Sequence, residues 1–315
     1  MASGKRAVYA AIIGNFCIAV IKFIAAGLSG SSAMLSEGIH SLVDTGNGGL
    51  LLLGMKRSLR PPTSQHPFGY GKEVYFYTLI VAVLIFGVGG GISIYEGILH
   101  VLHPVELSDP TVNYIVLGIA IVFEASVFLV ALREFRKVKG RKGFWEEVKS
   151  SKDPTTFTVL FEDTAALAGL VVAMIGIFIG HALEMPVFDG LASICIGLIL
   201  CGVASLLIVE SKGLLLGESV DPDVRESVKE VTGRDPDVMH VVRMMSMHVG
   251  PDDVLVNLDL NFRSGLSGME IQQVIKRIEK ALSEKHPEIK YLTIEAGPAG
   301  SSGEATIRSE GDLKP

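Results

Sequence analysis

Six windows of this chain are each long and apolar enough to cross a lipid bilayer, and they constrain the fold more than any other feature. A spanning helix needs roughly 20 predominantly apolar residues. The windows cover about residues 7–28, 32–55, 73–100, 111–132, 157–182 and 187–209. They leave little room before position 210 for other structure. We therefore expect residues 1–210 to form an α-helical membrane domain with six transmembrane helices.

Composition favours a membrane protein over two other classes. The 315 residues are 49% hydrophobic and 20% charged, which is too apolar for an ordinary soluble enzyme of this length. We expect no catalytic site and no enzymatic activity. The net charge of −6 argues against a nucleic-acid partner, because phosphate contact needs a clustered basic surface.

The pattern changes after residue 210, where charged residues become frequent. Residues 211–220 read as a linker, and residues 221–296 show the order helix, strand, strand, helix, strand. That order suits a small α+β domain with its helices on one face of a sheet. A short sheet leaves a face or an edge open, so we expect dimerisation through this domain. The Gly- and Ser-rich tail at 297–315 is expected to be disordered.

Loop charges set the expected orientation in the membrane. Lys and Arg residues precede the first window and follow the second and the fourth, where the basic stretch 133–152 lies. The alternate loops at 27–32, 101–110 and 181–187 contain neither residue. By the positive-inside rule both termini are cytoplasmic, and we expect the plasma (inner) membrane.

A few ionisable side chains lie inside the apolar windows. Such groups are costly in a bilayer and indicate a functional site. In the second window, Glu37, His40 and Asp44 are spaced three and four residues apart, which places them on one helical stripe that Asn47 extends. The fifth window carries an adjacent acidic pair at positions 162 and 163.

His40, Asp44, Asp163 and Glu162 together supply one imidazole and three carboxylates. That donor set suits a divalent cation such as Zn²⁺, and it would also accept Mn²⁺, Fe²⁺ or Co²⁺. Metal and protons compete for these groups, which is the property that a proton-coupled antiporter needs. The metal is then transported cargo rather than a bound cofactor. The alternative for His40 and Asp44 is a hydrogen-bonded pair between helices.

Other charges inside the windows have structural alternatives. Glu162 could point away from Asp163 and pair with Lys22 or with a polar group. Glu37 is expected to be a vestibule or structural group rather than a ligand. Lone carboxylates at positions 96 and 124 are also expected to be structural.

These residues resemble the cation diffusion facilitator family of divalent-metal/proton antiporters. The resemblance rests on His40-x-x-x-Asp44, on the turn HPFGYGK at 66–72, and on the charged fifth window. The motif LFEDTAA at 160–166 is most similar to the zinc-transporter-nine-like branch.

The resemblance implies further features. It implies that residues 221–296 form a cytoplasmic ferredoxin-like domain that makes a homodimer. It also implies a charge interlock between Lys72 and Glu218. Weak, peripheral metal contacts are implied at His66, His240 and Glu295.

Two departures from the family pattern affect the metal site. Many zinc members carry a ligand four residues before the fifth-window Asp, and here Val159 occupies that position. The fourth ligand is then Glu162, Asn47 or water. Tyr70 replaces the second His of the turn, which weakens a loop site at His66.

Three functions follow from the sequence. The first is a secondary transporter that exports Zn²⁺ from the cytoplasm in exchange for protons. The second is the same transporter with Mn²⁺, Fe²⁺ or Co²⁺ as its preferred ion. The third is a membrane-anchored metal sensor or scaffold that does not transport.

Overall fold

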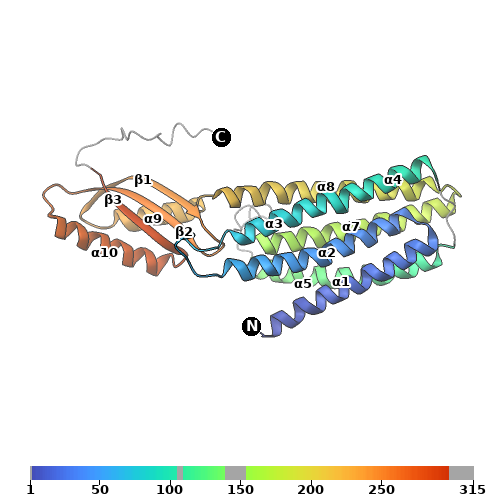
Figure 1. Ribbon diagram of the computed structural model, residues 1–315. Helices are drawn as coiled ribbons and strands as arrows, with labels where there is room; N and C mark the ends of the chain where they lie inside the picture. The colour runs from blue at the N-terminus through green and yellow to red at the C-terminus, as the bar shows by residue number, and fades with distance from the viewer. Residues whose placement is uncertain (1, 105–108, 139–153, 298–315) are drawn as a thin grey trace. The chain divides into compact units, whose positions relative to one another are not determined.

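The chain folds into two compact units in a computed structural model that describes residues 2–104, 109–138 and 154–297 (Figure 1). One unit comprises residues 1–60 and 72–215, and the other comprises residues 61–71 and 216–315. Most of the basic stretch expected at 133–152, and nearly all of the expected tail, lie outside the described residues.

The first unit is a bundle of long helices. Five of its helical segments are long and apolar enough to cross a membrane: Ile12–Ser29, Glu73–Leu102, Thr111–Val130, Phe157–Ala182 and Val187–Leu216. They belong to α1 (Ala2–Ser29), α3 (Glu73–Leu84) with η1 (Ile85–Gly91) and α4 (Ile92–Leu102), α5 (Thr111–Val138), α7 (Pro154–Ala182) and α8 (Val187–Leu216). A multi-pass membrane protein follows from their length and hydropathy.

The third window is not one regular helix. Its middle, η1, is a π-helix with the sequence IFGVGGG. Glycine is a poor former of regular α-helix, and the π conformation is often found at functional sites. Periodicity alone did not predict this interruption.

Helix α2 (Ser32–Ser58) occupies the second window and is more polar than its neighbours. Its 27 residues rise about 40 Å, which exceeds a hydrocarbon core of about 30 Å. Its ionisable side chains lower its hydropathy, so α2 is not among the five apolar segments. It packs against α1, α3, η1, α4 and α7, which shield much of its surface.

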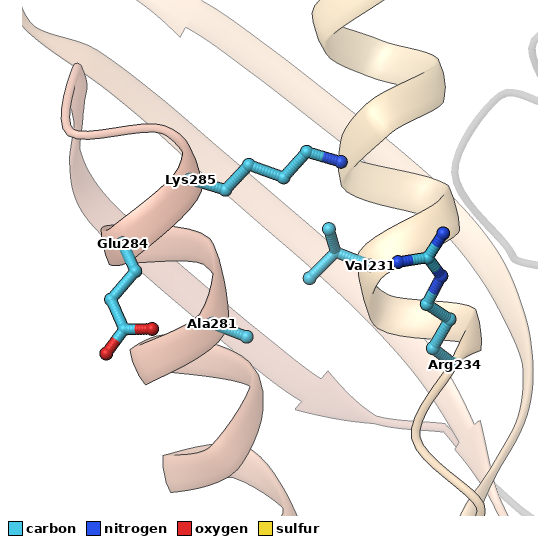
Figure 2. A pocket seen from close by; sticks show the side chains of 5 residues that line it. All are labelled: Val231, Arg234, Ala281, Glu284 and Lys285. Atoms are coloured by element: carbon cyan, nitrogen blue, oxygen red, sulfur yellow. The ribbon is translucent and has the colours of Figure 1, made fainter.

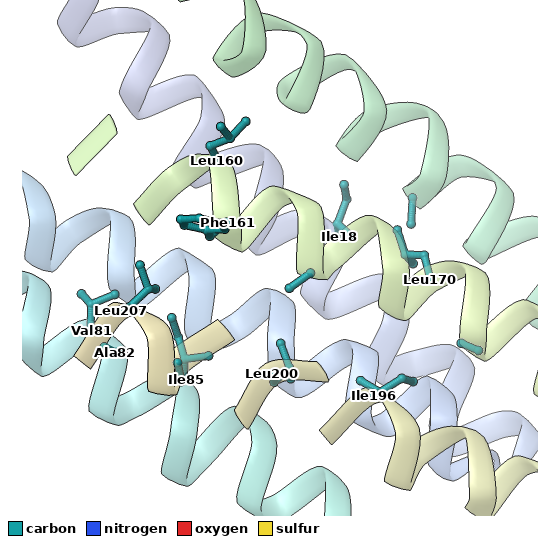
Figure 3. Packing of buried hydrophobic residues seen from close by; sticks show 14 of the residues in the cluster. Ile18, Val81, Ala82, Ile85, Leu160, Phe161, Leu170, Ile196, Leu200 and Leu207 are labelled. Carbon is teal, nitrogen blue, oxygen red and sulfur yellow. The ribbon is translucent and has the colours of Figure 1, made fainter. Parts of the chain in front are cut away.

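The apolar core of the bundle surrounds α2. It draws buried side chains from several helices, including Ile18 of α1, Val81 of α3, Ile85 of η1, Phe161 of α7 and Leu200 of α8 (Figure 3). Dispersion contacts between such side chains are small individually and large in sum. This packing holds the helices that enclose the polar residues of α2.

A buried carboxylate of α8 caps the first turn of α2. Asp189 is 1% exposed and accepts hydrogen bonds from the Ser32 backbone N–H and hydroxyl and from the Ser31 hydroxyl. The hydroxyls of Ser36 and Ser193 also share a hydrogen bond between the same two helices. A carboxylate at a helix N-terminus satisfies unpaired N–H groups and complements the helix dipole. The start of α2 is therefore fixed to α8.

Glycine allows α4 and α8 to approach each other closely. A Cβ atom added at Gly97 would lie 2.7 Å from the backbone oxygen of Gly190, and one added at Gly190 would lie 2.9 Å from that of Gly97. Gly90 and Gly197 repeat the relation one heptad away, at 3.0 and 2.7 Å. Small residues at matching positions are typical of tight helix packing in membranes.

Gly97→Ala is expected to destabilise the bundle by about 1–3 kcal/mol, because its methyl group would overlap backbone atoms that cannot rotate away. Thermal unfolding in detergent, followed by circular dichroism, measures the change. Gly202→Ala is the matched control on α8, since nothing lies within 4 Å of a Cβ atom there. Equal midpoints for both variants would contradict the close approach.

The second unit has the order of elements that the sequence predicted. Helix α9 (Pro222–Gly233) is followed by β1 (Val238–His248), β2 (Val254–Phe262), α10 (Gly268–Lys285) and β3 (Ile289–Ala296). The sheet order is β1-β2-β3, with β1 antiparallel and β3 parallel to β2. The antiparallel pair is a hairpin, and α10 is the crossover between the parallel strands.

The two faces of this sheet differ in character. Val256, Leu258 and Leu260 alternate along β2 on the face that packs against the helices. The residues between them are partly exposed, and Met245 beside Asn257 is 47% exposed. Segment 61–71 packs on this unit, where the ring of Phe68 lies edge-on to Tyr291 with centroids 5.1 Å apart. The second face is therefore only partly covered.

An ion-pair network ties α10 to the start of β1. Arg277 donates two hydrogen bonds to Asp235, at 2.8 and 2.9 Å, and another to Asp237. The hydrogen bonds from Arg277 hold the pKa of Asp235 below its usual value. A lowered carboxyl pKa stabilises the folded state above the unfolded pKa of about 4, and this stabilisation is lost as the pH falls through the lowered value.

Asp235→Asn is expected to lower the thermal midpoint of the second unit at pH 7. The difference from wild type should shrink as the pH falls below about 4, because the wild-type carboxylate then becomes protonated as well. Calorimetry at several pH values measures this. Glu279→Gln, an exposed position on α10, serves as the control. A difference that stays constant with pH would contradict the role of the charge.

Candidate metal centre

His40 and Asp44 lie one turn apart near the middle of α2. The His40 side chain is buried, and its Nδ1 lies 3.4 Å from Oδ1 of Asp44. Among the described residues neither nitrogen of His40 has a hydrogen-bond partner, and neither has Oδ1 of Asp44. Buried polar atoms are normally paired, so unpaired ones need an explanation. These atoms are the donors that a bound cation would use.

Helix α7 supplies the acidic half of the centre. Glu162 is 8% exposed, and its Oε1 accepts a hydrogen bond of 2.9 Å from Nδ2 of Asn47. This bond joins α7 to α2. Asp163 is half-buried, and its Oδ2 has no hydrogen-bond partner in the described part of the chain. The carboxylate of Asp163 is thus available, whereas that of Glu162 is partly engaged.

The two halves are near each other without forming one ligand cluster. The charges of Glu162, Glu124 and Asp163 interact electrostatically with Asp44. Within the residues that the structure describes, however, no three His, Cys, Asp or Glu side chains are arranged to hold one metal ion. Metal binding would have to draw α2 and α7 together.

A second polar cluster lies one turn from His40. Lys22 of α1 and Glu37 of α2 are both 0% exposed, and Nζ lies 2.9 Å from Oε2. The same ammonium donates to the hydroxyl of Ser41 at 2.8 Å. The sequence allowed Lys22 to pair with Glu162, but the structure pairs it with Glu37. That Glu37 is a vestibule or structural group stays a prediction, and the structure adds its ion pair with Lys22.

The peripheral residues stand apart from this centre. His66 is exposed, and its ring lies 4.5 Å from that of Tyr70. His240 and Glu295 are exposed on the outer strands, where Glu295 accepts a hydrogen bond from Asn257. None of these residues belongs to a metal-holding group among the described residues. Their metal contacts stay predictions.

The two residues of the expected charge interlock each have a contact within their own unit. Lys72 donates to the backbone oxygen of Leu215 at 3.2 Å, within the helical unit. Glu218 belongs to the other unit, where its backbone oxygen accepts from His248. Pairing of Lys72 with Glu218 stays a prediction.

A surface hollow of about 380 Å³ lies in the second unit between α9 and α10 (Figure 2). It is lined by Val231, Arg234, Ala281, Glu284 and Lys285. Arg234 and Lys285 both form ion pairs with Glu230. The hollow includes no residue of the candidate metal centre.

Comparison with known proteins decides the family. Residues 8–216 match the cation efflux transmembrane domain, which is more than half of the chain. The chain belongs to the cation efflux family. This is the family of cation diffusion facilitators that the second and fifth windows resemble, and transport of cations is its common activity.

Several cation efflux relatives align along nearly the whole chain. The mouse and human proteins named "Proton-coupled zinc antiporter SLC30A9, mitochondrial" are each 32% identical over 98% of this chain and 56% of their own length. "Metal tolerance protein C4" of Arabidopsis thaliana is 30% identical over 87% of this chain and 60% of its own. The predicted similarity to the zinc-transporter-nine-like branch is confirmed. The chain spans about half the length of these relatives.

Neither the cap that Asp189 forms nor the pairing of Lys22 with Glu37 was predicted from the sequence of this cation efflux bundle. Asp189 is a lone acid at the start of a window, and Lys22 is a lone base inside one. A charge in an apolar window is itself the signal, because each must find a partner within the protein.

Asn47→Leu is expected to weaken metal binding about tenfold or more, because Glu162 loses the amide that orients it. Zinc titration of the purified protein in detergent, with a competing dye, measures the affinity. Thr45→Val is the matched control, since among the described residues that hydroxyl bonds only to the backbone oxygen of Ser41 on its own helix. An unchanged affinity for Asn47→Leu would show that the link is not part of the centre.

Proposed function

We propose that this protein exchanges a divalent transition-metal cation, Zn²⁺ in preference to Mn²⁺, Fe²⁺ or Co²⁺, for protons across a membrane. One observation carries the proposal. The buried His40–Asp44 pair has donor atoms without hydrogen-bond partners among the described residues, and the helix that carries it packs against α7, which carries the acidic pair. The relatives named as zinc antiporters support the same conclusion.

The donor chemistry favours zinc and permits proton coupling. One imidazole with carboxylate oxygens is a donor set that tetrahedral Zn²⁺ commonly uses, and the imidazole favours Zn²⁺ over Mn²⁺, which prefers oxygen ligands. Carboxylates that lose a metal in a buried site are costly to leave charged, so protons take its place. His40, Asp44, Asp163 and Glu162 are the proposed ligands, with Asn47 orienting Glu162.

The proposed topology has six membrane spans, namely the five apolar segments and α2. The length of α2 is sufficient, and the surrounding apolar helices cover its polar face. The basic loops support cytoplasmic termini in a membrane that bounds the cytoplasm, with metal exported from that side.

The second unit is proposed to be a ferredoxin-like dimerisation domain. Its order of strands and the helices on one face support that fold. The half-covered second face, with Met245 exposed, supports pairing with another copy of the chain.

In proteoliposomes loaded with a zinc dye and a pH dye, wild type is expected to move Zn²⁺ and protons in opposite directions. Asp44→Ala and Asp163→Ala should each lower zinc flux about tenfold or more, because each removes a carboxylate ligand. Glu96→Gln is the control, since Glu96 lies outside the proposed ligand set. Competition with Mn²⁺, Fe²⁺ and Co²⁺ tests the preferred ion.

Three results would argue against the proposal. Normal flux in Asp44→Ala would reject the site, and metal flux without opposite proton flux would reject the coupling. Zinc binding by wild type with no flux would favour the membrane-anchored sensor.

A further inference from the structure

The Lys22–Glu37 pair has no part in the proposed metal centre, yet it is the most deeply buried ion pair among the described residues. Both side chains are 0% exposed. Lys22 reaches from α1 to two groups of α2, the carboxylate of Glu37 and the hydroxyl of Ser41. Burying two charges stabilises a fold less than apolar packing would, so such a pair calls for a functional explanation.

Glu37 also has a carboxylate oxygen that is free to coordinate a metal ion. Its Oε1 is buried and has no hydrogen-bond partner within the described part of the chain. This oxygen faces α7 at Gly169, where an added Cβ atom would collide with it. Glu124 of α5, 3% exposed, is near enough to interact electrostatically with both Lys22 and Glu37. One carboxylate oxygen of Glu37 therefore pairs with the Lys22 ammonium, and the other has no hydrogen-bond partner among the described residues.

The position of Glu37 along α2 is the third observation. Glu37 lies three positions before His40, a rise of about 4.5 Å toward Ser32 at the start of α2. Ser41 directly follows His40 on the same helix, so the two groups that Lys22 contacts lie on either side of His40 along the chain. The Lys22 ammonium thus binds a carboxylate and a hydroxyl within about one turn of the proposed ligand.

We propose that Glu37 and Ser41 form a second station for the transported divalent cation, and that the Lys22 ammonium fills this station between passages. The inference rests on the proposed function, since it assigns a step to the same cargo. A tethered ammonium cannot leave the protein, so it neutralises Glu37 without consuming a proton or a metal ion. One carboxylate and one hydroxyl bind a divalent cation weakly, which allows the cation to move on.

The test counts zinc ions on the purified full-length protein in detergent, by isothermal titration and elemental analysis. Lys22→Met is expected to bind one more Zn²⁺ per chain than wild type, because the ammonium no longer occupies the station. The double variant Lys22→Met/Glu37→Gln should return to the wild-type count, because the carboxylate is also gone. Lys22→Arg keeps a cation in place and should match wild type.

A second measurement does not require removal of the buried lysine. Gly169→Ala places a methyl group against Oε1 of Glu37, and we expect it to slow zinc flux at least about fivefold with zinc affinity unchanged. Gly46→Ala on α2 is the control, since nothing lies within 4 Å of a Cβ atom there.

The outcomes separate this inference from the proposed function. An extra zinc ion that depends on Glu37, in a protein that exchanges no metal for protons, would support the station and reject the exchange. Exchange in wild type without that extra ion in Lys22→Met would overturn the station alone. If Lys22→Met fails to fold, wild-type flux in Gly169→Ala would overturn it instead.

Discussion

The polar side chains that α2 places inside an otherwise apolar bundle are the constraint on which the rest of the bundle depends. Helix α2 carries Glu37, His40 and Asp44, and in a bilayer each polar atom has to find its partner inside the protein. Lys22 comes from α1, Glu162 from α7 and Asp189 from α8. The apolar faces of these helices then isolate the cluster from lipid. Helices α1, α7 and α8 thus each supply a hydrogen-bond partner to the polar side of α2.

His40 and Asp44 are exceptions to this pairing, and that makes them chemically available. Both ring nitrogens of His40 and Oδ1 of Asp44 have no hydrogen-bond partner among the described residues. The same holds for Oδ2 of Asp163 on α7. Because the two halves of the centre belong to different helices, a cation that binds them all would shift one helix relative to the other. In the proposed exchange, the binding energy would then contribute to the conformational change, since a ligand shifts an equilibrium by its differential affinity for the two states.

Spacing along single elements made part of this arrangement predictable. The three- and four-residue spacing of Glu37, His40 and Asp44 predicted their common stripe, and alternation predicted β1 and β2. Contacts between helices were not predictable in the same way. The link from Asn47 to Glu162 depends on how α2 and α7 are rotated about their axes, which periodicity does not specify. The π-helix η1 also interrupts a window that reads as one continuous helix.

The cap on α2 has a consequence for how the protein is made. Asp189 lies more than 150 residues after Ser32, so α2 leaves the ribosome long before the carboxylate that completes its first turn. The least apolar of the bundle's long helices therefore lacks this cap until α8 has been synthesised. We expect α2 to remain loosely held beside α1 until α8 arrives, which makes the last span the one that completes the bundle.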